Sequence, residues 1–360
     1  MDKIQPISIC IITKNECENL RHCLECLAPY AKASNHEIVV VDTGSTDDTI
    51  NMCREFTDCI YHFTWINDFS AARNFAAEQA THDWIMCIDS DEYVSVWDEE
   101  DIQQQIIAHA NEIGCIYQCN TCGTGRNQYE IRDPASRLYN RRLFHFEHTI
   151  HEQLFPLDAA LGQKYFFVKV DVAHYAYAGD AETLASKSQR NITLLKQELE
   201  EKPHDVYTMF QLGQSYYMIE DFETAHYYYD MALAEDIDPR QGFVNTLITS
   251  YGYTLLELKQ YQKALQLEGV YETFSHRADF VFLMGMIYLN NGFVEDAFYQ
   301  FEKATTYSDS KVVGANSFRA WHNMGVILEC TGNTKEALKY YEKCGDFAPA
   351  KERIQVLKQS

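Results

Sequence analysis

Long apolar runs are missing from this chain of 360 residues. None of its hydrophobic stretches approaches the roughly 20 residues that a membrane-spanning helix needs, so we expect no membrane span. Residues 1–6 also lack the apolar segment of a secretory signal peptide. Both absences favour a cytoplasmic location.

Positive charge is scarce as well. The chain has 30 Lys and Arg against 53 Asp and Glu, a formal net charge of −23. A surface this acidic argues against nucleic acid and against an anionic membrane as the partner. It suits a basic acceptor, or it simply maintains solubility.

Cysteine is not scarce, with 12 residues. The spacings Cys23-x-x-Cys26 and Cys119-x-x-Cys122 are compatible with a zinc site. However, Cys23 and Cys26 lie in a predicted amphipathic helix, and the first pair lacks the Gly or Pro of a zinc knuckle. We therefore expect free, mostly buried thiols of a reducing compartment rather than zinc ligands.

The first half of the chain alternates short apolar runs with helical patterns. The runs expected as strands are residues 7–12, 37–41, 59–63 and 84–88. Helices are expected around Leu20–Leu27, after residue 46 and over residues 70–80. This alternation predicts an α/β domain with a mostly parallel mixed sheet.

Acidic residues follow three of these strands. Asp89 and Asp91 come after residues 84–88, Asp42 after 37–41, and Glu16 shortly after 7–12. Ligands of parallel sheets bind beyond the carboxyl ends of the strands, where these acids should meet. Clustered buried acids need a cation, and a hard divalent ion with a substrate diphosphate is one solution. In the helix that follows Asp42, Ser45 or Thr46 suits the N-cap.

These motifs, in this order, resemble family 2 glycosyltransferases. The resemblance is carried by residues 7–16, 40–47, 68–74 and 89–91. Later motifs are similar to a bacterial branch in which helical repeats follow the transferase: Arg137-Leu138-Tyr139, Ile150-His151-Glu152, His174-Tyr175 and Lys187-x-x-Arg190-Asn191. The resemblance implies a GT-A fold, a nucleotide-sugar donor, most simply a UDP-sugar, and Mn²⁺ or Mg²⁺.

The resemblance also implies roles for individual residues. Contacts with the nucleotide sugar are expected from Thr13, Asn15, Glu16, Asp42, Ser45, Arg73, Asn74, Asp89 and Ser90. The metal ligands are expected to be Asp91, Asp89 and His174, with His151 as the alternative to His174. Arg73 is expected either to clamp the diphosphate or to support Asp89.

Glu152 is the expected catalytic base, with Asp133 and Asp158 next in line. A local basic cluster in residues 134–163 could offset the charge of a nucleotide diphosphate. For Arg141 and Arg142 within this cluster we expect an ordinary surface position instead.

The second half changes character after Pro203. Four glycines each precede an alanine by 12 residues: Gly213 and Ala225, Gly252 and Ala264, Gly285 and Ala297, Gly325 and Ala337. This offset is typical of tetratricopeptide repeats, in which small residues let two helices cross and aromatic residues fill the space between them. The second unit is the weakest, with Glu268 where the other units have an aromatic residue.

The sequence thus predicts a GT-A domain (residues 1–178), a connecting helix (179–203) and an all-α repeat domain (204–360). The predicted function is metal-dependent, inverting transfer of a sugar to a Ser or Thr hydroxyl or a Cys thiol of a protein or peptide held by the repeats. One alternative is transfer to a surface polysaccharide or lipid-linked glycan, and another is a repeat scaffold with an inactive transferase domain. The repeats either capture peptides or serve only to form a homodimer or cap the enzyme.

Overall fold

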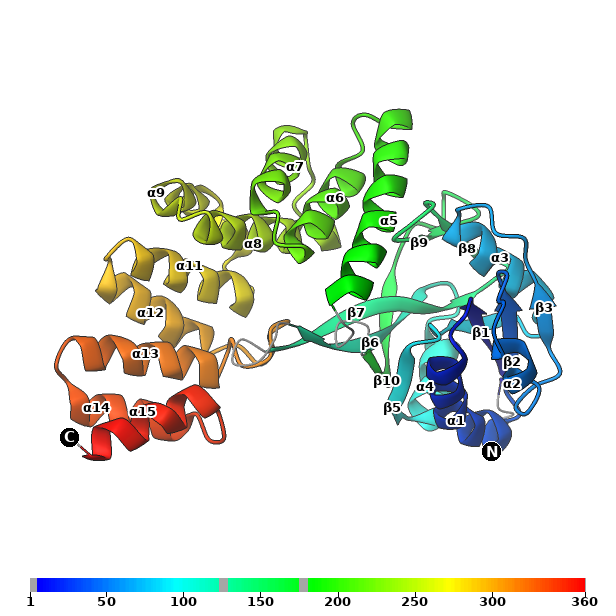
Figure 1. Ribbon diagram of the computed structural model, residues 1–360, viewed down its shortest axis with the longest axis horizontal. Helices are drawn as coiled ribbons and strands as arrows, with labels where there is room; N and C mark the ends of the chain where they lie inside the picture. Colours follow the sequence, from blue (N-terminus) through cyan, green and yellow to red (C-terminus); the bar gives the residue numbers. More distant parts are fainter. Residues whose placement is uncertain (1–4, 123–128, 175–180, 360) are drawn as a thin grey trace. The chain divides into compact units, whose positions relative to one another are not determined.

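The computed structural model describes residues 5–122, 129–174 and 181–359. The chain divides into two compact units, residues 1–184 and 185–360. Figure 1 shows strands and helices in the first unit and helices in the second. In the described part of the chain, no helix combines the length and the apolar composition needed to cross a bilayer.

The first unit is built on a mixed sheet. Its described strands follow the order β3-β2-β1-β4-β7-β6-β10-β5, and β8 pairs separately with β9. The strands are β1 (Ile7–Thr13), β2 (Glu37–Asp42), β3 (Ile60–His62), β4 (Trp84–Cys87), β5 (Glu92–Trp97), β6 (Ile113–Cys122), β7 (Tyr129–Asn140), β8 (Phe144–Glu147), β9 (Gln153–Pro156) and β10 (Tyr165–His174).

The four predicted apolar runs form the parallel half of this sheet. β1 pairs in parallel with both β2 and β4, and β2 pairs in parallel with β3. The prediction of a mostly parallel mixed sheet is therefore confirmed. The antiparallel strand β7 was not predicted. It joins β4 to β6, and residues expected to lie in a connecting stretch belong to it.

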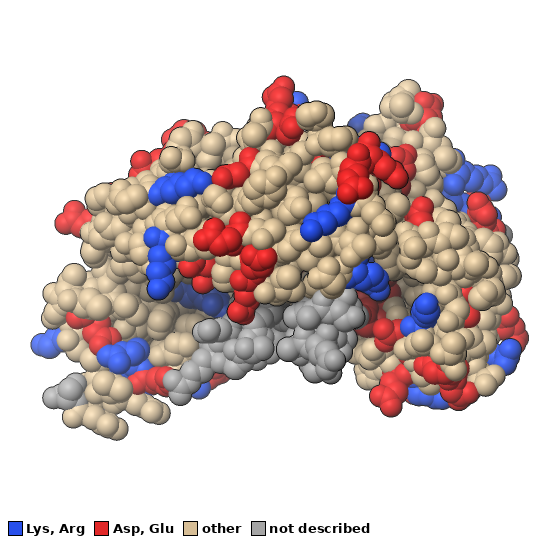
Figure 2. Space-filling model, turned by 45° about the horizontal axis from the view of Figure 1, so that its top comes forward, with Lys and Arg blue, Asp and Glu red and all other residues tan. Residues whose placement is uncertain are grey.

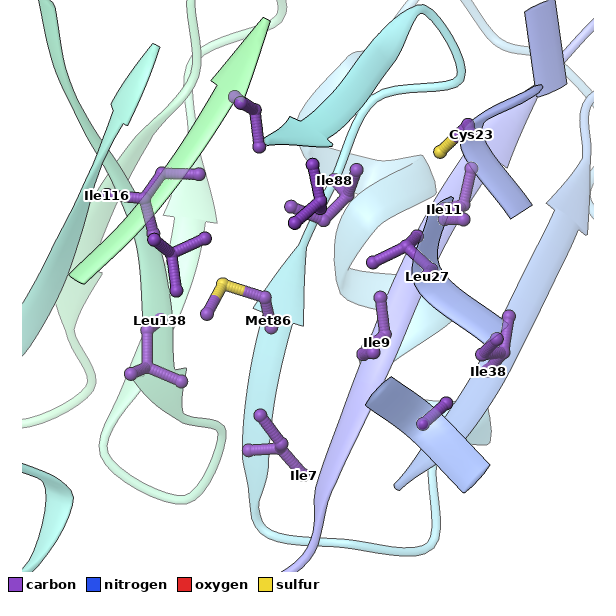
Figure 3. Close-up of a cluster of buried hydrophobic side chains, with 14 of the residues drawn as sticks. Ile7, Ile9, Ile11, Cys23, Leu27, Ile38, Met86, Ile88, Ile116 and Leu138 are labelled. Atoms are coloured by element: carbon purple, nitrogen blue, oxygen red, sulfur yellow. The ribbon is translucent and has the colours of Figure 1, made fainter. Parts of the chain in front are cut away.

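Helices cover both faces of the sheet. One face packs against α1 (Cys17–Ser34), α2 (Thr49–Cys53) and α4 (Glu99–Ala108), with side chains such as Ile9, Leu27 and Met86 between the layers (Figure 3). The other face packs against the small side chains of α3 (Phe69–Gln79) and against β8. Burying both faces explains why these strands are continuous apolar runs.

Two local expectations have different outcomes. The N-cap prediction for Ser45 or Thr46 is wrong, because α2 begins only at Thr49 and Asp48 precedes it. Cys23 is buried on the core-facing side of α1, as expected for a core thiol, whereas Cys26 is only partly buried. The side chain of Cys122 in the second Cys-x-x-Cys pair lies outside the described residues.

The second unit consists of paired helices. They are α5 (Ala181–Glu201), α6 (Val206–Met218), α7 (Phe222–Ala234), α8 (Gly242–Glu257), α9 (Tyr261–Ala264), the 3₁₀ helix η3 (Leu265–Val270), α10 (Tyr271–Phe274), α11 (Ala278–Asn290), α12 (Val294–Ala304), α13 (Phe318–Cys330), α14 (Thr334–Lys343) and α15 (Ala348–Gln359).

The same spacing between a glycine and an aromatic residue recurs in three repeats because the two residues pack against each other. A Cβ atom on Gly213, Gly285 or Gly325 would lie 2.3, 2.7 or 2.6 Å from a ring of the paired helix. The rings are those of Tyr229, Phe301 and Tyr341, all fully buried. Glycine therefore permits an aromatic side chain to fill the crossing between the two helices of a unit.

The second repeat departs from this arrangement where the sequence does. Glu268 replaces the aromatic residue, and the second helix of this unit is broken into α9, η3 and α10. At Gly252 a Cβ atom would instead meet Leu283 of the next unit at 2.5 Å and Leu267 at 2.8 Å. Aliphatic side chains thus close the crossing that a ring closes elsewhere.

A single methyl group tests this packing. Because the Phe301 ring is buried, we expect Gly285→Ala to destabilise the second unit by about 1–2 kcal/mol, the cost of overpacking less the gain in helix propensity. Gly269→Ala is the matched control, since a Cβ there would have nothing within 4 Å. Urea unfolding followed by circular dichroism measures both variants. Equal stabilities would contradict the assignment of Gly285 to a helix crossing.

Candidate active site

Parallel strands end together at one edge of the sheet. Thr13, the last residue of β1, pairs with Asp42, the last residue of β2. The backbone N–H of Ile88, just after β4, donates to the carbonyl of Cys10 in β1 at 3.2 Å. Asp89 therefore leaves β4 at the same edge, and the predicted meeting of these strand ends is confirmed.

The loops after β1 and β2 are bonded to each other. The backbone N–H of Asn15 donates to Ser45 Oγ at 2.9 Å, and Asn15 Oδ1 accepts from the backbone of Thr46 at 2.7 Å. Asn15 has a φ of 55°, a conformation that asparagine tolerates better than most residues. Glu16 donates through its backbone to Thr49 Oγ1 at 3.1 Å. The two loops thus form one continuous wall at the rim.

Asp42 is the buried acid of this wall. Its Oδ1 accepts from the backbone N–H of Ser45 at 2.8 Å, and its Oδ2 lies 3.3 Å from His62 Nδ1. Burial alone would raise the pKa of Asp42, but the hydrogen bonds from Ser45 and His62 outweigh burial and hold this pKa below its ordinary value. Asp42 is therefore an ionised hydrogen-bond acceptor.

Asp89 is held between two buried arginines. Its Oδ1 accepts from Arg73 Nη2 at 2.6 Å, and its Oδ2 accepts from Arg137 Nη2 at 2.6 Å. Burial opposes ionisation, yet the two guanidinium groups hold the pKa of Asp89 far below its ordinary value. Both carboxylate oxygens are thus engaged by cations of the protein itself.

Glu92 is a buried carboxylate of this site that was not predicted. Its side chain is fully buried, with Oε1 accepting from Arg137 at 2.9 Å and from Gln118 at 2.5 Å. Its Oε2 accepts from the backbone N–H of Asp89 at 2.8 Å. Glu92 thereby fixes both Arg137 and the turn that carries Asp89 and Asp91.

Glu152 joins the same network through Arg73. Its Oε1 accepts a short hydrogen bond from Arg73 Nε, and its side chain is only 11% exposed. Burial alone would raise the pKa of Glu152, but the Arg73 guanidinium overcomes burial and lowers it. Arg73 therefore links Glu152 to Asp89 directly.

The start of α3 positions this part of the network. Ser70 Oγ donates to the carbonyl of His148 at 2.5 Å, and the backbone N–H of Phe69 donates to the carbonyl of Thr149 at 2.9 Å. Asn74 donates to and accepts from the backbone of Phe146, both at 2.9 Å. The amide of Asn74, predicted to contact the nucleotide sugar, thus attaches β8 to α3.

Two buried donors at the rim make no hydrogen bond within the described residues. They are Thr13 Oγ1, at the end of β1, and Arg73 Nη1, inside the ion network. A buried donor without an acceptor costs about 1–3 kcal/mol, and each such group in a folded protein calls for an explanation. Ligand oxygens at this edge are candidate acceptors, once the side chains of Thr13 and Arg73 turn to expose the two donors.

The other predicted site residues lie around the same turn. Ser90 is buried and Asp91 is partly buried. The backbone of His174, in β10, pairs with that of Glu92, the residue after Asp91, but the side chain of His174 lies outside the described residues. His151 precedes Glu152 and adopts a φ of 52°.

The predicted basic cluster separates into different roles. Arg137 belongs to the ion network described above. Arg141 Nη1 donates to the carbonyls of Ala77 and Ala80, both at 2.6 Å, and so satisfies the last turn of α3. Arg142 is 74% exposed and pairs with Asp83 on the surface, as expected.

The mixed sheet with its rim of acids and the paired helices together define a class of protein: a GT-A-type α/β domain joined to tetratricopeptide repeats. Residues 8–169 match the model of glycosyl transferase family 2, and residues 318–351 match a tetratricopeptide-repeat model. The chain therefore carries a family 2 glycosyltransferase domain followed by a tetratricopeptide-repeat region.

Several curated proteins are similar to this chain. The SPbeta prophage-derived glycosyltransferase SunS of Bacillus subtilis (strain 168) is 28% identical over 253 residues, which cover 66% of this chain and 56% of SunS. A TPR repeat-containing protein of Synechococcus elongatus is 28% identical over 58% of this chain and 51% of its own length. The chain thus spans little more than half the length of these relatives.

Several solved structures are similar to part of this chain. MamA of Desulfovibrio magneticus RS-1 is 20% identical, covering 51% of this chain and 99% of MamA, with a TM-score of 0.38. The TPR protein YrrB is 21% identical, covering 50% of this chain and 93% of YrrB, with a TM-score of 0.40. TM-scores of this size support no argument about this chain.

Removing one arginine of the network should be costly. Arg137→Met leaves the fully buried Glu92 without its guanidinium partner and Asp89 with one guanidinium fewer, so we expect the first unit to lose about 3–5 kcal/mol of unfolding free energy. Arg142→Met is the control, because an exposed ion pair contributes about 0–1 kcal/mol. Denaturant unfolding followed by tryptophan fluorescence measures both variants, since Trp65, Trp84 and Trp97 lie in the first unit. A loss below 1 kcal/mol for Arg137→Met would contradict the network.

Proposed function

We propose that this chain is a metal-dependent, inverting glycosyltransferase that moves a sugar from a UDP-sugar to a protein or peptide acceptor. The observation that carries the proposal is the pair of orphaned buried donors, Thr13 Oγ1 and Arg73 Nη1, at the edge where parallel strands end. Ligands of such sheets bind at this edge. The family 2 domain supports the reaction class.

The donor nucleotide would lie along the wall formed by the loops after β1 and β2. Asp42, kept ionised, accepts the N–H of the uracil ring, and Glu16, Asn15 and Ser45 flank the nucleoside. Thr13 Oγ1 and Arg73 Nη1, which have no hydrogen-bond acceptor among the described residues, would donate to oxygen atoms of the nucleotide sugar. These roles keep the nucleotide contacts predicted for this wall, while Asn74 positions β8 instead.

The charges of the rim fit a divalent cation. Asp89, Glu92 and Glu152 carry three negative charges against the two positive charges of Arg73 and Arg137. Asp91 adds another negative charge in the same turn, and carboxylate oxygens suit Mn²⁺ or Mg²⁺. When bound, such an ion supplies the Lewis acid that neutralises the departing diphosphate.

The two aspartates of the turn, Asp89 and Asp91, have different proposed roles. Asp91 ligates the metal directly, and the position of His174 beside Glu92 makes it the second candidate ligand, ahead of His151. Asp89 has both oxygens on arginines and therefore orients Arg73 and Arg137, and through them the diphosphate. Ser90 holds the spacing between the two aspartates.

Glu152 is the proposed base. Arg73 keeps Glu152 ionised, the form that can accept a proton from an acceptor hydroxyl or thiol as that group attacks the anomeric carbon, although the same ion pair makes Glu152 a weaker base. A single displacement of this kind inverts the anomeric centre. The acceptor would be held by the repeats, in a cytosolic reaction that uses the cellular pool of nucleotide sugars.

Titration calorimetry of UDP with and without Mn²⁺ tests the metal assignment. Asp91→Asn keeps the size of the side chain but removes its charge, so we expect it to abolish the Mn²⁺-dependent part of UDP binding. Asp83→Asn, a surface acid paired with Arg142, is the control and should bind like wild type. Wild-type binding by Asp91→Asn would show that the metal is held elsewhere.

Turnover of a donor found with a nucleotide-sugar panel tests the base. Glu152→Gln removes a base but no metal ligand, so we expect donor affinity close to wild type and turnover reduced by ~10²-fold or more. Unchanged turnover would show that Glu152 is not the base and would make Asp133 or Asp158 the next candidate. Loss of donor binding would instead make Glu152 part of the donor site.

A further inference from the structure

An insertion separates the third and fourth repeats. Gly325 follows Gly285 by 40 residues, against 33 residues between Gly252 and Gly285. The additional residues lie between α12, which ends at Ala304, and α13, which begins at Phe318. We call residues 309–314 of this insertion the strap.

Three equivalent positions of successive repeats contact the strap. Each lies six residues before the glycine of its unit: Thr246 in the second, Asp279 in the third and Arg319 in the fourth. In a stacked array, equivalent positions line up along one face. The strap therefore runs along a shared face of the repeats instead of looping away from them.

Asp279 provides the central contact. Its Oδ2 accepts from the backbone N–H of Lys311 and its Oδ1 from that of Val312, both at 2.8 Å. Asp279 is partly buried, and burial raises its pKa although the two amide bonds oppose the rise. The carboxylate thus recognises two consecutive amides of the backbone, independently of the side chains.

The flanking repeats hold the segment on either side. Arg319 Nε donates to the carbonyl of Val313 at 3.2 Å, and the Lys311 ammonium donates to Thr246 Oγ1 at 3.4 Å. The side chain of Lys311 thus extends to α8, while its backbone stays on Asp279 of α11. Asp279 and Arg319 thus bind backbone atoms of the strap. A surface that binds the backbone can accept extended peptides of different sequence.

The ends of the insertion are also fixed. The Tyr307 hydroxyl donates a short hydrogen bond to the carbonyl of Ser275, and Asn316 donates to the carbonyl of Tyr307 at 3.0 Å. Gly314 has a φ of +90°, and a Cβ atom there would lie 2.3 Å from the Phe318 ring. The segment is therefore presented to the repeat face in one defined path.

From these contacts we infer that the face marked by Thr246, Asp279 and Arg319 is a peptide-binding surface and that the strap is its resident occupant. The inference rests on the proposed function, in which the repeats hold the acceptor. An acceptor displaces the strap with an extended stretch that offers two consecutive amides to Asp279, which excludes proline at those two positions.

A synthetic peptide with the sequence of residues 307–316 is the probe. It is tested against wild type and against a full-length variant in which the five residues 309–313 are replaced by five Gly and Ser residues. We expect this variant to bind the fluorescent peptide at least ~10-fold more tightly than wild type, in which the strap occupies the face. Adding Asp279→Ala to the variant should weaken binding by about 10-fold or more, because a charged acceptor of two hydrogen bonds is lost.

Glu295→Ala, an exposed acid on α12, is the control and should leave peptide binding unchanged. Equal binding to wild type and to the variant, or no binding to a folded variant, would overturn the inference. Asp91→Asn should not alter peptide binding, so failure of the transferase proposal is distinguishable from failure of this one.

Hydrogen exchange gives a second readout that needs no replaced strap. In wild type the amides of Lys311 and Val312 should be protected, and Asp279→Ala should speed their exchange by at least ~10-fold while the amide of Val281, inside α11, is unchanged. Unprotected strap amides in wild type would contradict a strap seated on the repeats.

Discussion

The Arg73 guanidinium bridges two carboxylates that the chain delivers from separate places, the partly buried Asp89 after β4 and the largely buried Glu152 between β8 and β9. Glu152 depends on this guanidinium, because an isolated buried charge is far costlier than a paired one, whereas Asp89 is also paired with Arg137. Arg137 and Glu92 complete the network from β7 and β5. The position of the proposed base and that of the proposed metal-binding turn therefore depend on one side chain of α3.

The sequence predicted the parallel strands because each is an apolar run that ends in polar residues. It could not predict that β7 inserts beside β4, since that pairing joins residues about 50 apart and has no local signal. Arg137 was therefore noted only as part of a family motif and of a basic cluster, without its partners in the network, and Glu92 was missed. Glu92 did carry a signal, because a third acid directly after Asp89-Ser90-Asp91 at a strand end requires a buried cation.

The repeats were easier to predict from the sequence than the position of β7, because the contacts within each repeat join residues that are close in the chain. The glycine of each unit and the aromatic residue 16 positions later meet within one helix pair, so their spacing survives in the sequence. Glu268 correctly marked the unit in which aliphatic side chains replace the ring. The strap was visible only as uneven spacing between units. Acidic side chains are scattered over the face shown in Figure 2, with Lys and Arg among them, so composition did not reveal which face the strap covers.

The central claim is that the two aspartates of one turn have different tasks, with Asp89 held by arginines and Asp91 binding the metal. A crystal structure of the complex with UDP and Mn²⁺ tests it most directly. The account predicts an Asp91 oxygen within about 2.3 Å of the metal, while both oxygens of Asp89 remain hydrogen-bonded to Arg73 and Arg137. Direct coordination of the metal by Asp89, with either arginine displaced, would contradict the account.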